Sequence, residues 1–436
     1  MRIRKAMLAL VAASLTAASL SACGTQDNTG GGGDATDGEA VTLTFWHNAT
    51  TGDGKAFWEK QAADFHAANP NVTIEITPVQ NEDFDGKLQN AMNSGDAPDV
   101  FLQRGGGKMQ DMIAAGQVMD ITDSITAETK AAVSEGMLAG KSFEGKIYGM
   151  PVAVLPGGLF YSKDLFEQAG ITSTPTTMDE LNAAIAKLKT LKGVAPVALG
   201  AKDAWPAAHW FYFFSIRECP SAVIDETAKT KTFNNDCWTK AGNDLKAFAD
   251  TKPFNDGFLT TSAQQGAGSS AGLLANHKAA MELMGAWDPG VIASLTPDEK
   301  PLADLAWFPF PDMPGTEGAA KAIMGGVDGF SCSASAPKEA CTAFLNWMVK
   351  KDVQEAYYKA FTAPPVNKDA QAVVTEPYLI SIMEALNSAT YTTDWLDTIL
   401  GQNVGNALNT GVVDLLAGKG DVAGIIQAAN DAAAKE

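Results

Sequence analysis

The sequence has few of the residues that metalloenzyme motifs need. It contains four histidines and five cysteines in 436 residues, and no H-E-x-x-H motif occurs among them. The cysteines show neither a C-x-x-C spacing nor a nearby pair of histidines, so a zinc site is not indicated. We therefore expect no metal and no other cofactor.

Positive charge is also scarce. Lys and Arg number 32 against 51 Asp and Glu, and the formal net charge is −19. Residues 1–22 hold three basic residues and no acidic one, so their removal changes the net charge to −22. Such a surface repels nucleic acid and anionic lipid, and we expect no nucleic-acid partner. No apolar run after residue 22 is long and uncharged enough to span a bilayer.

The first 22 residues have the pattern of a secretory signal. A basic start precedes the apolar segment 6–20, which is too short to cross a membrane. The segment is followed by L-S-A-C, which resembles the bacterial lipobox, whose cysteine is diacylated and becomes the mature N-terminus. We expect Cys23 to anchor the protein by lipid to the extracellular face of a Gram-positive cell membrane. The glycine-rich residues 24–40 indicate a flexible tether.

The remaining four cysteines fit an exported protein, because disulfides persist outside the cell. Four cysteines allow three pairings, and sequence alone does not choose rigorously among them. Proximity in the sequence favours disulfides Cys219–Cys237 and Cys332–Cys341, each of which closes a short loop.

About 396 residues follow the tether, which is enough for two domains. The first of them alternate between strand-like and helix-like patterns: 41–46, 53–69, 72–79, 83–92 and 100–102. This β-α-β-α-β order predicts an α/β fold with parallel strands and helices on both faces. Further along, Pro156-Gly157-Gly158 separates two predicted strands, and residues 325–331 are predicted to form a glycine-rich turn around Asp328.

The segment 93–107 contains the first candidate site. Its apolar run Val100–Leu102 predicts a buried strand, and Gln103 and Arg104 follow directly, before three glycines. In open α/β sheets, ligands bind where such strands end. We therefore predict that Gln103 and Arg104 meet a ligand, although an ordinary turn between a strand and a helix has the same pattern.

Six sequence blocks resemble, in order, those of the family 1 extracellular solute-binding proteins, the ligand-capturing subunits of ABC importers. The blocks are T-F-W-H-N (44–48), G-D-A-P-D-V (95–100), Y-G-M-P with Y-S-K-D-L-F-E-Q-A-G-I (148–171), P-T-T-M-D-E-L (175–181), K-A-A-M with G-A-W (278–287) and G-G-V-D-G-F (325–330). One departure is His277, where the family commonly has glycine.

This resemblance implies a periplasmic-binding-protein-like fold, with two discontinuous lobes joined by hinge crossovers and a ligand cleft between them. The N-terminal lobe would comprise residues 41–150 and 302–350, and the C-terminal lobe residues 151–301 and 351–436. The implied function is capture of a sugar, above all an oligosaccharide, by cleft closure and its delivery to the permease subunits of the ABC transporter. We expect a monomer that performs no chemistry on the sugar.

The chemistry of sugar capture selects candidate residues. A tryptophan ring offers a flat surface to the C–H face of a pyranose, and polar or charged side chains bind its hydroxyl groups. The predicted ligand-binding residues are Trp46, His47, Asn48, Gln103, Arg104, Trp205, His209, Trp210, Trp287, Asp288, Asp328, Asp394 and Trp395. Each of these tryptophans could instead pack in a core.

The alternative function is that of a surface-anchored glycan-degrading enzyme. With 51 acidic residues, the chain always offers some pair of carboxylates for glycoside hydrolysis. The motif G-S-S-A-G at 268–272 matches G-x-S-x-G, but no apolar strand precedes it as a nucleophile elbow requires. We therefore predict a flexible loop there.

Overall fold

The computed structural model describes residues 39–435, so the signal sequence, Cys23 and nearly all of the predicted tether lie outside the described part of the chain. The first elements are three strands, each followed by a helix: β1 (Val41–His47), α1 (Gly52–Ala68), β2 (Val72–Pro78), α2 (Asn81–Ser94), β3 (Val100–Gln103) and α3 (Gly106–Ala114). The strands pair in the order β2-β1-β3 and are parallel, which confirms the predicted alternation.

Local sequence explains these elements. Helix α1 buries Trp58, Ala62 and Phe65 on one face, at the spacing that an amphipathic helix requires. Helix α2 ends at Gly95, which adopts the left-handed conformation common after a helix C-terminus. The β1–β3 pairing is reinforced by Asp99, whose Oδ2 accepts from the backbone nitrogen and the hydroxyl of Thr44, both at 2.8 Å.

Two long strands continue the sheet beyond β3. They are β6 (Met150–Ser162) and β10 (Ile323–Cys332), which pair antiparallel, and β10 also pairs with β3. The sheet continues through β8 (Ala279–Gly285) to β7 (Ala195–Ala198), in the order β2-β1-β3-β10-β6-β8-β7. The short strands β9 (Leu305–Phe308) and β11 (Thr392–Thr393) pair with β6 and β10.

Both long strands correct the sequence prediction. Pro156-Gly157-Gly158 does not interrupt β6, because the strand changes partner there, from β10 at Pro156 to β8 at Gly157. Residues 325–331 form strand and not a turn, because both edges of β10 are paired. Only a register shift between Asp328 and Gly329 marks the irregularity that the glycines suggested.

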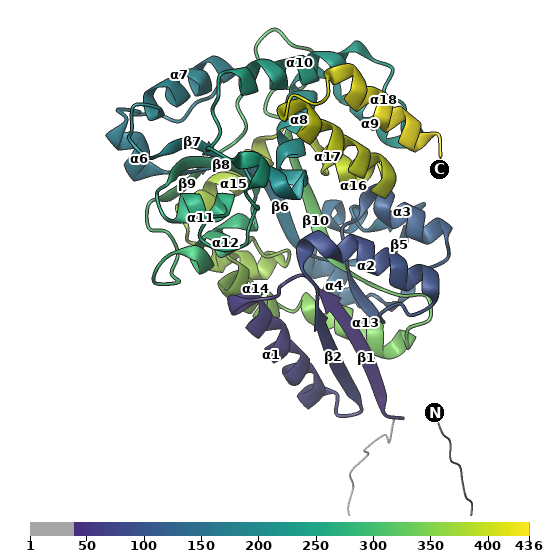
Figure 1. The fold of residues 1–436 in the computed structure, drawn as a ribbon. Helices are drawn as coiled ribbons and strands as arrows, with labels where there is room; N and C mark the ends of the chain where they lie inside the picture. The colour runs from purple at the N-terminus through teal and green to yellow at the C-terminus, as the bar shows by residue number, and fades with distance from the viewer. Residues whose placement is uncertain (1–38, 436) are drawn as a thin grey trace, which may run out of the picture. The chain divides into compact units, whose positions relative to one another are not determined.

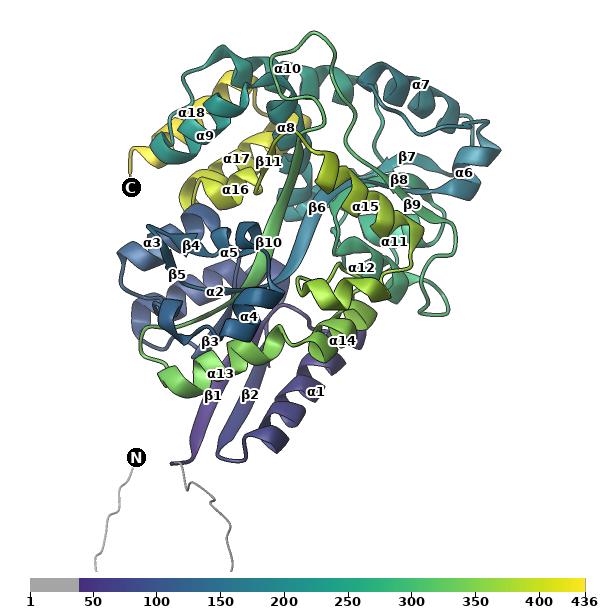
Figure 2. The same ribbon diagram turned by 180° about the vertical axis from the view of Figure 1, so that it is seen from behind.

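The other elements surround this sheet (Figures 1 and 2). Before β7 they are η1 (Thr122–Ser124), α4 (Ala127–Ala132), α5 (Glu135–Ala139), β4 (Ser142–Phe143), β5 (Lys146–Ile147), α6 (Lys163–Gln168) and α7 (Met178–Leu188). From β7 to β10 they are η2 (Ala201–Asp203), α8 (Trp205–Glu218), α9 (Ser221–Thr230), α10 (Asp236–Asp250), η3 (Phe258–Thr260), α11 (Ser270–Ala275) and α12 (Asp288–Leu295). After β10 they are α13 (Lys338–Met348), α14 (Lys351–Phe361), η4 (Lys368–Val373), α15 (Pro377–Ser388), α16 (Leu396–Ile399), α17 (Gln402–Leu416) and α18 (Val422–Ala433).

Buried apolar side chains form two large clusters. The first cluster takes in the sheet strands β1 and β3 with α1, α13 and α14, whereas the second takes in α7, α8, α10, α17 and α18. In Figure 1, β1 and β2 with α1 occupy the lower part of the ribbon, and α8, α10, α17 and α18 the upper part. Residues 353–382 contribute to the first cluster and residues 395–429 to the second. The predicted lobe boundaries stay a prediction.

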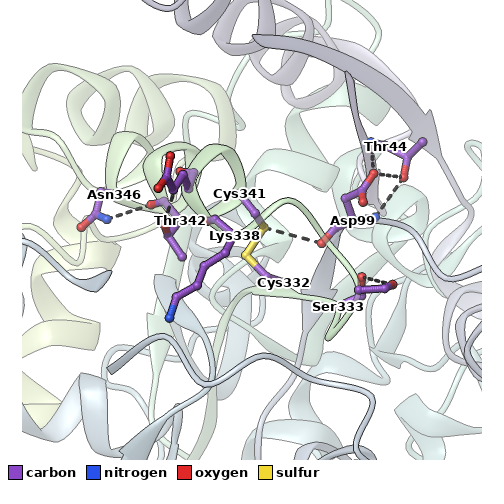
Figure 3. Close-up of a disulfide and its surroundings, with 10 residues drawn as sticks. Thr44, Asp99, Cys332, Ser333, Lys338, Cys341, Thr342 and Asn346 are labelled. Atoms are coloured by element: carbon purple, nitrogen blue, oxygen red, sulfur yellow. Dashed lines mark hydrogen bonds between the residues drawn. A yellow bond between two sulfur atoms is a disulfide. The ribbon is translucent and has the colours of Figure 1, made fainter. Parts of the chain in front are cut away.

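Both predicted disulfides are present. Cys219–Cys237 joins the end of α8 to the first turn of α10, and Cys332–Cys341 joins the end of β10 to α13. Figure 3 shows the second disulfide next to Asp99 and Thr44, so it fastens α13 beside the β1–β3 pairing.

The helices between residues 39 and 435 include none that is both long and apolar enough to span a membrane.

Candidate functional site

Four aromatic rings gather where strand β6 changes its partner from β10 to β8. We call Trp205, His209, Trp287 and Trp395 the aromatic cluster. His209 and Trp395 stack with ring centroids 3.9 Å apart and an interplanar angle of 16°. Trp287 lies 5.7 Å from Trp395 and 6.1 Å from Trp205, in both cases edge to face. The cluster therefore unites side chains from α8, from the turn after β8 and from the turn before α16.

A pair of glycines makes room for two of these rings. Gly157 of β6 and Gly285 of β8 are directly paired, so their missing side chains would lie on the same face of the sheet. A Cβ atom on Gly285 would lie 2.0 Å from Trp287 Cζ3, and one on Gly157 would lie 2.5 Å from Trp395 Cη2. Both distances are far below a van der Waals contact, so glycine at both positions is what allows the rings to lie on the strands.

Two atoms of the aromatic cluster lack partners. Trp205 Nε1 and His209 Nδ1 are buried and have no hydrogen-bond partner within the described residues. Burial lowers the pKa of His209 to about 4, against the weaker opposing effect of Asp397, so the ring is neutral at physiological pH. Unpaired buried polar atoms are costly, so each of them needs a physical explanation.

Charged and amide side chains gather beside these rings. We call this set the polar group; its members are Asn81, Asp85, Arg104, Lys108, Lys141, Asp328 and Asp394. Arg104 Nε donates to Asp85 Oδ1 at 3.1 Å, Arg104 Nη2 donates to Asn81 Oδ1 at 2.8 Å, and Arg104 Nη1 lies 3.7 Å from Asp328 Oδ2. Lys108 Nζ adds a bond of 2.7 Å to Asp85 Oδ2.

The electrostatics of the polar group follow from these contacts. Burial opposes ionisation of Asp85, but Arg104 and Lys108 overcome it and hold the pKa of that carboxyl below its usual range. Asp85 and Asp328 in turn raise the pKa of Arg104, against the effect of burial. Asp85 and Arg104 are therefore both ionised at neutral pH, and their charges compensate each other.

Lys141 and Asp394 connect the polar group to the aromatic cluster. Lys141 is fully buried, and its Nζ donates to the backbone oxygen of Gln103 at 2.5 Å. A Cβ atom on Gly105 would lie 3.3 Å from Lys141 Nζ and 3.8 Å from Asp394 Oδ2, so both groups flank this glycine. Burial lowers the pKa of Lys141 and raises that of Asp394, while each group partly offsets the shift of the other. Asp394 directly precedes Trp395 in the chain.

The structure brings most of the predicted site residues into these two sets. Trp205, His209, Trp287 and Trp395 form the aromatic cluster, and Arg104, Asp328 and Asp394 belong to the polar group. Asn48 Nδ2 donates to Asn81 Oδ1 at 3.1 Å, which places Asn48 at its margin. Gln103 is buried, and its side-chain oxygen accepts from Gly105 N at 3.1 Å, so its amide shapes the turn in front of α3.

Other predicted residues lie elsewhere. Trp210 is fully buried in the second cluster and stacks on Phe248 at 4.7 Å, so it packs in a core.

His47 is fully buried beside Phe45, and its Nδ1 accepts from Ala49 N at 3.2 Å. Burial lowers the pKa of His47 to about 4. Trp46 is half-buried against the first cluster. Asp288 is fully buried behind the turn that carries Trp287.

Sequence reasoning missed Asn81, Asp85, Lys108 and Lys141. Asn81 and Asp85 lie in the first turns of α2, which follows the end of β2, so the rule that selected Gln103 and Arg104 could have found them. Lys141 lies in a connection outside the central sheet, and its sequence surroundings carry no signal for this position.

The predicted loop at 268–272 is also corrected. Ser269 caps helix α11, its side chain accepts from Gly272 N, and Ser269 and Ser270 are fully buried. Ser270 Oγ donates to the backbone oxygen of Ala263 at 3.0 Å and is no exposed nucleophile.

Known proteins share this architecture. Residues 48–355 match the family model described as bacterial extracellular solute-binding protein. An uncharacterized ABC transporter extracellular-binding protein of Pyrococcus horikoshii is 26% identical over 353 residues, which cover 80% of this chain and 76% of that protein. A lactose-binding protein of Rhizobium radiobacter is 27% identical over 313 residues, which cover 70% of this chain and 69% of that protein.

Solved structures agree. The structure of a chitin oligosaccharide binding protein is 25% identical and matches with a TM-score of 0.82, covering 91% of this chain and 100% of that one. The chain belongs to the family of bacterial extracellular solute-binding proteins. The resemblance drawn from the six blocks and the predicted two-lobed α/β fold are thus confirmed.

Proposed function

We propose that this chain is the substrate-binding component of an ABC importer and that it captures an oligosaccharide. The observation that carries this proposal is the aromatic cluster adjoining the polar group at Asp394 and Trp395. The names of its relatives support the same ligand class, since one binds lactose and another chitin oligosaccharides.

The two sets of side chains suit a sugar in complementary ways. Trp287 and Trp205 are half-buried, and each offers ring surface to the C–H face of a pyranose. Arg104 and Asp328 keep about a fifth to a quarter of their side chains exposed, at 20% and 24%. Their charged groups form stronger bonds to hydroxyl groups than neutral ones do. Because several rings are grouped together, a ligand with more than one sugar unit fits them better than a monosaccharide.

Capture by closure fits this distribution. Arg104, Asp85 and Lys141 belong to the part of the chain before β6, whereas the aromatic cluster comes from segments after it. A ligand that contacts both sets stabilises the closed arrangement of the lobes over the open one. The permease subunits then recognise the closed form, and a single protein molecule suffices for this task.

No chemistry on the sugar is needed for this role, and we propose that the protein is not an enzyme. Asp85 supports this view, because it is bonded to Arg104 and Lys108 and is not free to act as an acid or base. The alternative, a surface-anchored glycan-degrading enzyme, requires shortened sugar products.

The test uses residues 40–436, which form one compact unit. A glycan array followed by calorimetric titration should yield at least one oligosaccharide that binds one to one. Chromatography of the sugar after prolonged incubation should return it unchanged. Binding to no glycan would contradict the proposal, and shortened sugars would favour the enzyme.

Anchoring by lipid is proposed from L-S-A-C alone, since Cys23 lies outside the described residues. The variant Cys23→Ser should be released into the medium or remain unprocessed, whereas the wild-type protein should carry lipid mass on its N-terminal cysteine. Intact wild-type protein without that mass would contradict the anchoring.

A further inference from the structure

A pair of buried carboxyl groups lies behind the turn that carries Trp287. Glu282 of β8 and Asp288 of α12 are 1% and 0% exposed, and none of their four carboxyl oxygens accepts a hydrogen bond from an N–H or hydroxyl donor within residues 39–435. Two carboxylates without cations cannot both stay ionised in such a place, because desolvation and mutual repulsion add up.

The alternation of β8 fixes where the pair lies. Met281 and Leu283 pack in the second cluster and Met284 packs in the first, so Glu282 faces the side of the sheet that α11 and α12 cover. The ring of Trp287 lies over Gly285 on the opposite side. Glu282 and Asp288 thus hold the turn Ala286–Asp288 from behind, while Trp287 projects from its front.

Ser270 does not supply Glu282 with a hydrogen-bond donor. Its hydroxyl lies near Glu282, but its single hydrogen is donated to the backbone oxygen of Ala263 at 3.0 Å. The carboxyl oxygens of Glu282 therefore remain without a donor from this side chain.

We propose that Glu282 is a positioning residue for ligand binding, because it shares one proton with Asp288 and this hydrogen-bonded pair fixes the turn that presents Trp287. The inference rests on the proposed function only in taking Trp287 as a ligand-binding ring. A carboxyl that donates to a carboxylate forms a strong, short hydrogen bond, and it resists rotation of the turn better than an apolar contact does.

The titration behaviour agrees with this geometry. Burial and the neighbouring Asp288 raise the pKa of Glu282 well above its usual range, and burial raises the pKa of Asp288 to about 7. The pair therefore releases its protons at a higher pH than two free carboxyl groups would.

Few other charges face the pair. Helix α11 and strands β6 and β7 carry none, and α12 carries only Asp288. Helix α14 contacts α12 and carries four charged residues: Lys351, Asp352, Glu355 and Lys359. All of them are exposed except Glu355, and Glu355 pairs with Lys351 at 3.4 Å.

Helix α8 contributes neutral His209 near Trp287, as well as Arg217 and Glu218 at its other end. Asp203 of η2 is engaged with Ala263 N at 2.7 Å.

Two measurements without any sugar test the proposal on residues 40–436. Infrared spectroscopy at neutral pH should show the carbonyl band of a protonated carboxyl. This band should lose intensity in Glu282→Gln and in Asp288→Asn, because an amide can donate the hydrogen bond in place of the carboxyl. Asp394, whose pKa is raised by burial to about 7, contributes to the band that remains. Both variants preserve shape, and the exposed Glu167→Gln is the matched control that should keep the band.

Tryptophan emission gives the second measurement. Wild-type emission should change as the pH rises from neutral to alkaline. The change should be absent in Trp287→Phe, which identifies the ring that reports it, and in Glu282→Gln, but it should persist in Glu167→Gln. The proposal is overturned by a band that keeps its wild-type intensity in both amide variants, or by an emission change that is equal in Glu282→Gln and the wild type. Failure of sugar binding would affect neither readout, so the proposed function and this inference can fail separately.

Discussion

The aromatic cluster and the polar group differ in how far their polar atoms are satisfied. Arg104, Asp85 and Lys108 compensate one another through ion pairs and hydrogen bonds, so this side of the site is set before a ligand arrives. The aromatic cluster retains buried nitrogen atoms without partners, on Trp205 and His209. We infer that the rings supply most of the binding free energy, while the polar group fixes the orientation of the sugar.

The substitution Trp287→Ala tests the energetic side of this contrast. Loss of the stacking ring should cost about 2–4 kcal/mol of binding, which is about a thirtyfold to thousandfold loss of affinity. The melting temperature should change little, because the ring is half-buried. Calorimetry and thermal unfolding check both expectations.

Trp210→Phe is the matched control, since Trp210 is fully buried in the second cluster. It should lower the melting temperature and leave the affinity nearly unchanged. Were Trp287→Ala to lose its fold and keep its affinity, the roles of these two tryptophans would be exchanged.

Arg104→Leu tests the polar side. Removal of the Arg104 guanidinium leaves Asp328 without this ion pair and leaves Asp85 paired only with Lys108. The affinity should fall by about 1.5–3 kcal/mol, which corresponds to roughly tenfold to a hundredfold, because hydrogen bonds of charged groups have this strength. Lys87→Leu, which breaks an exposed pair with Asp83, should leave calorimetric affinity as in the wild type. Equal effects of both changes would remove Arg104 from the site.

Gly285→Ala should disturb the aromatic cluster without deleting a ring. The new methyl group would meet the Trp287 ring at 2.0 Å, so the ring must move, and overpacking of this kind costs about 1–3 kcal/mol of stability. Affinity should fall with it. Gly86→Ala is the control, because no atom lies within 4 Å of its added Cβ and a helical alanine stabilises by about 0.5–1 kcal/mol. Unchanged affinity in Gly285→Ala would show that the ring position does not matter.

The carboxyl groups of Asp288 and Asp85 should make the stability of the protein depend on pH in opposite directions. The pKa of Asp288 is raised to about 7 by burial, so the unfolded chain releases this proton first and stability falls as pH rises from about 4 to about 7. The pKa of Asp85 is lowered, although burial opposes this, by Arg104 and Lys108. Its contribution is therefore present above about pH 4 and is lost as the solution becomes more acidic.

Urea unfolding at pH 4.5 and pH 7.5 distinguishes the two carboxyls. Relative to the wild type, Asp288→Asn should gain roughly 1–2 kcal/mol between the lower and the higher pH. Asp85→Asn should be about equally destabilised at both pH values, because both lie above the range in which Asp85 titrates. A clear pH dependence of the Asp85→Asn difference, or none for Asp288→Asn, would contradict the assignment of their environments.

The sequence predicted the fold well where local patterns are decisive. The opening β-α-β-α-β order was predicted from spacing and composition, both disulfides were favoured by proximity in the sequence, and the structure has them all. The site could be predicted in part. Trp287 and Arg104 lie just after strands β8 and β3, where ligands bind in open α/β sheets. Trp210 lies within helix α8 and packs in a core, which its residue type alone did not reveal.

What local patterns could not predict depends on long-range contact. Pro156-Gly157-Gly158 resembles a turn, but its glycines leave space for rings of Trp307 and Trp395, which come from distant segments. The pKa shifts of Lys141 and Glu282 arise from burial that only the folded chain creates. Lys141 is buried beside Asp394, and Glu282 is buried under helices α11 and α12. No short segment of the sequence shows which distant residues will bury these side chains.

The claim that an oligosaccharide is captured by closure of two lobes is tested most directly by small-angle X-ray scattering. The radius of gyration of residues 40–436 should be measured with and without a saturating concentration of the sugar that binds best on the array. The account predicts a smaller radius with sugar, and no such decrease with a sugar that does not bind. An unchanged radius at saturation, confirmed by calorimetry under the same conditions, would contradict capture by closure.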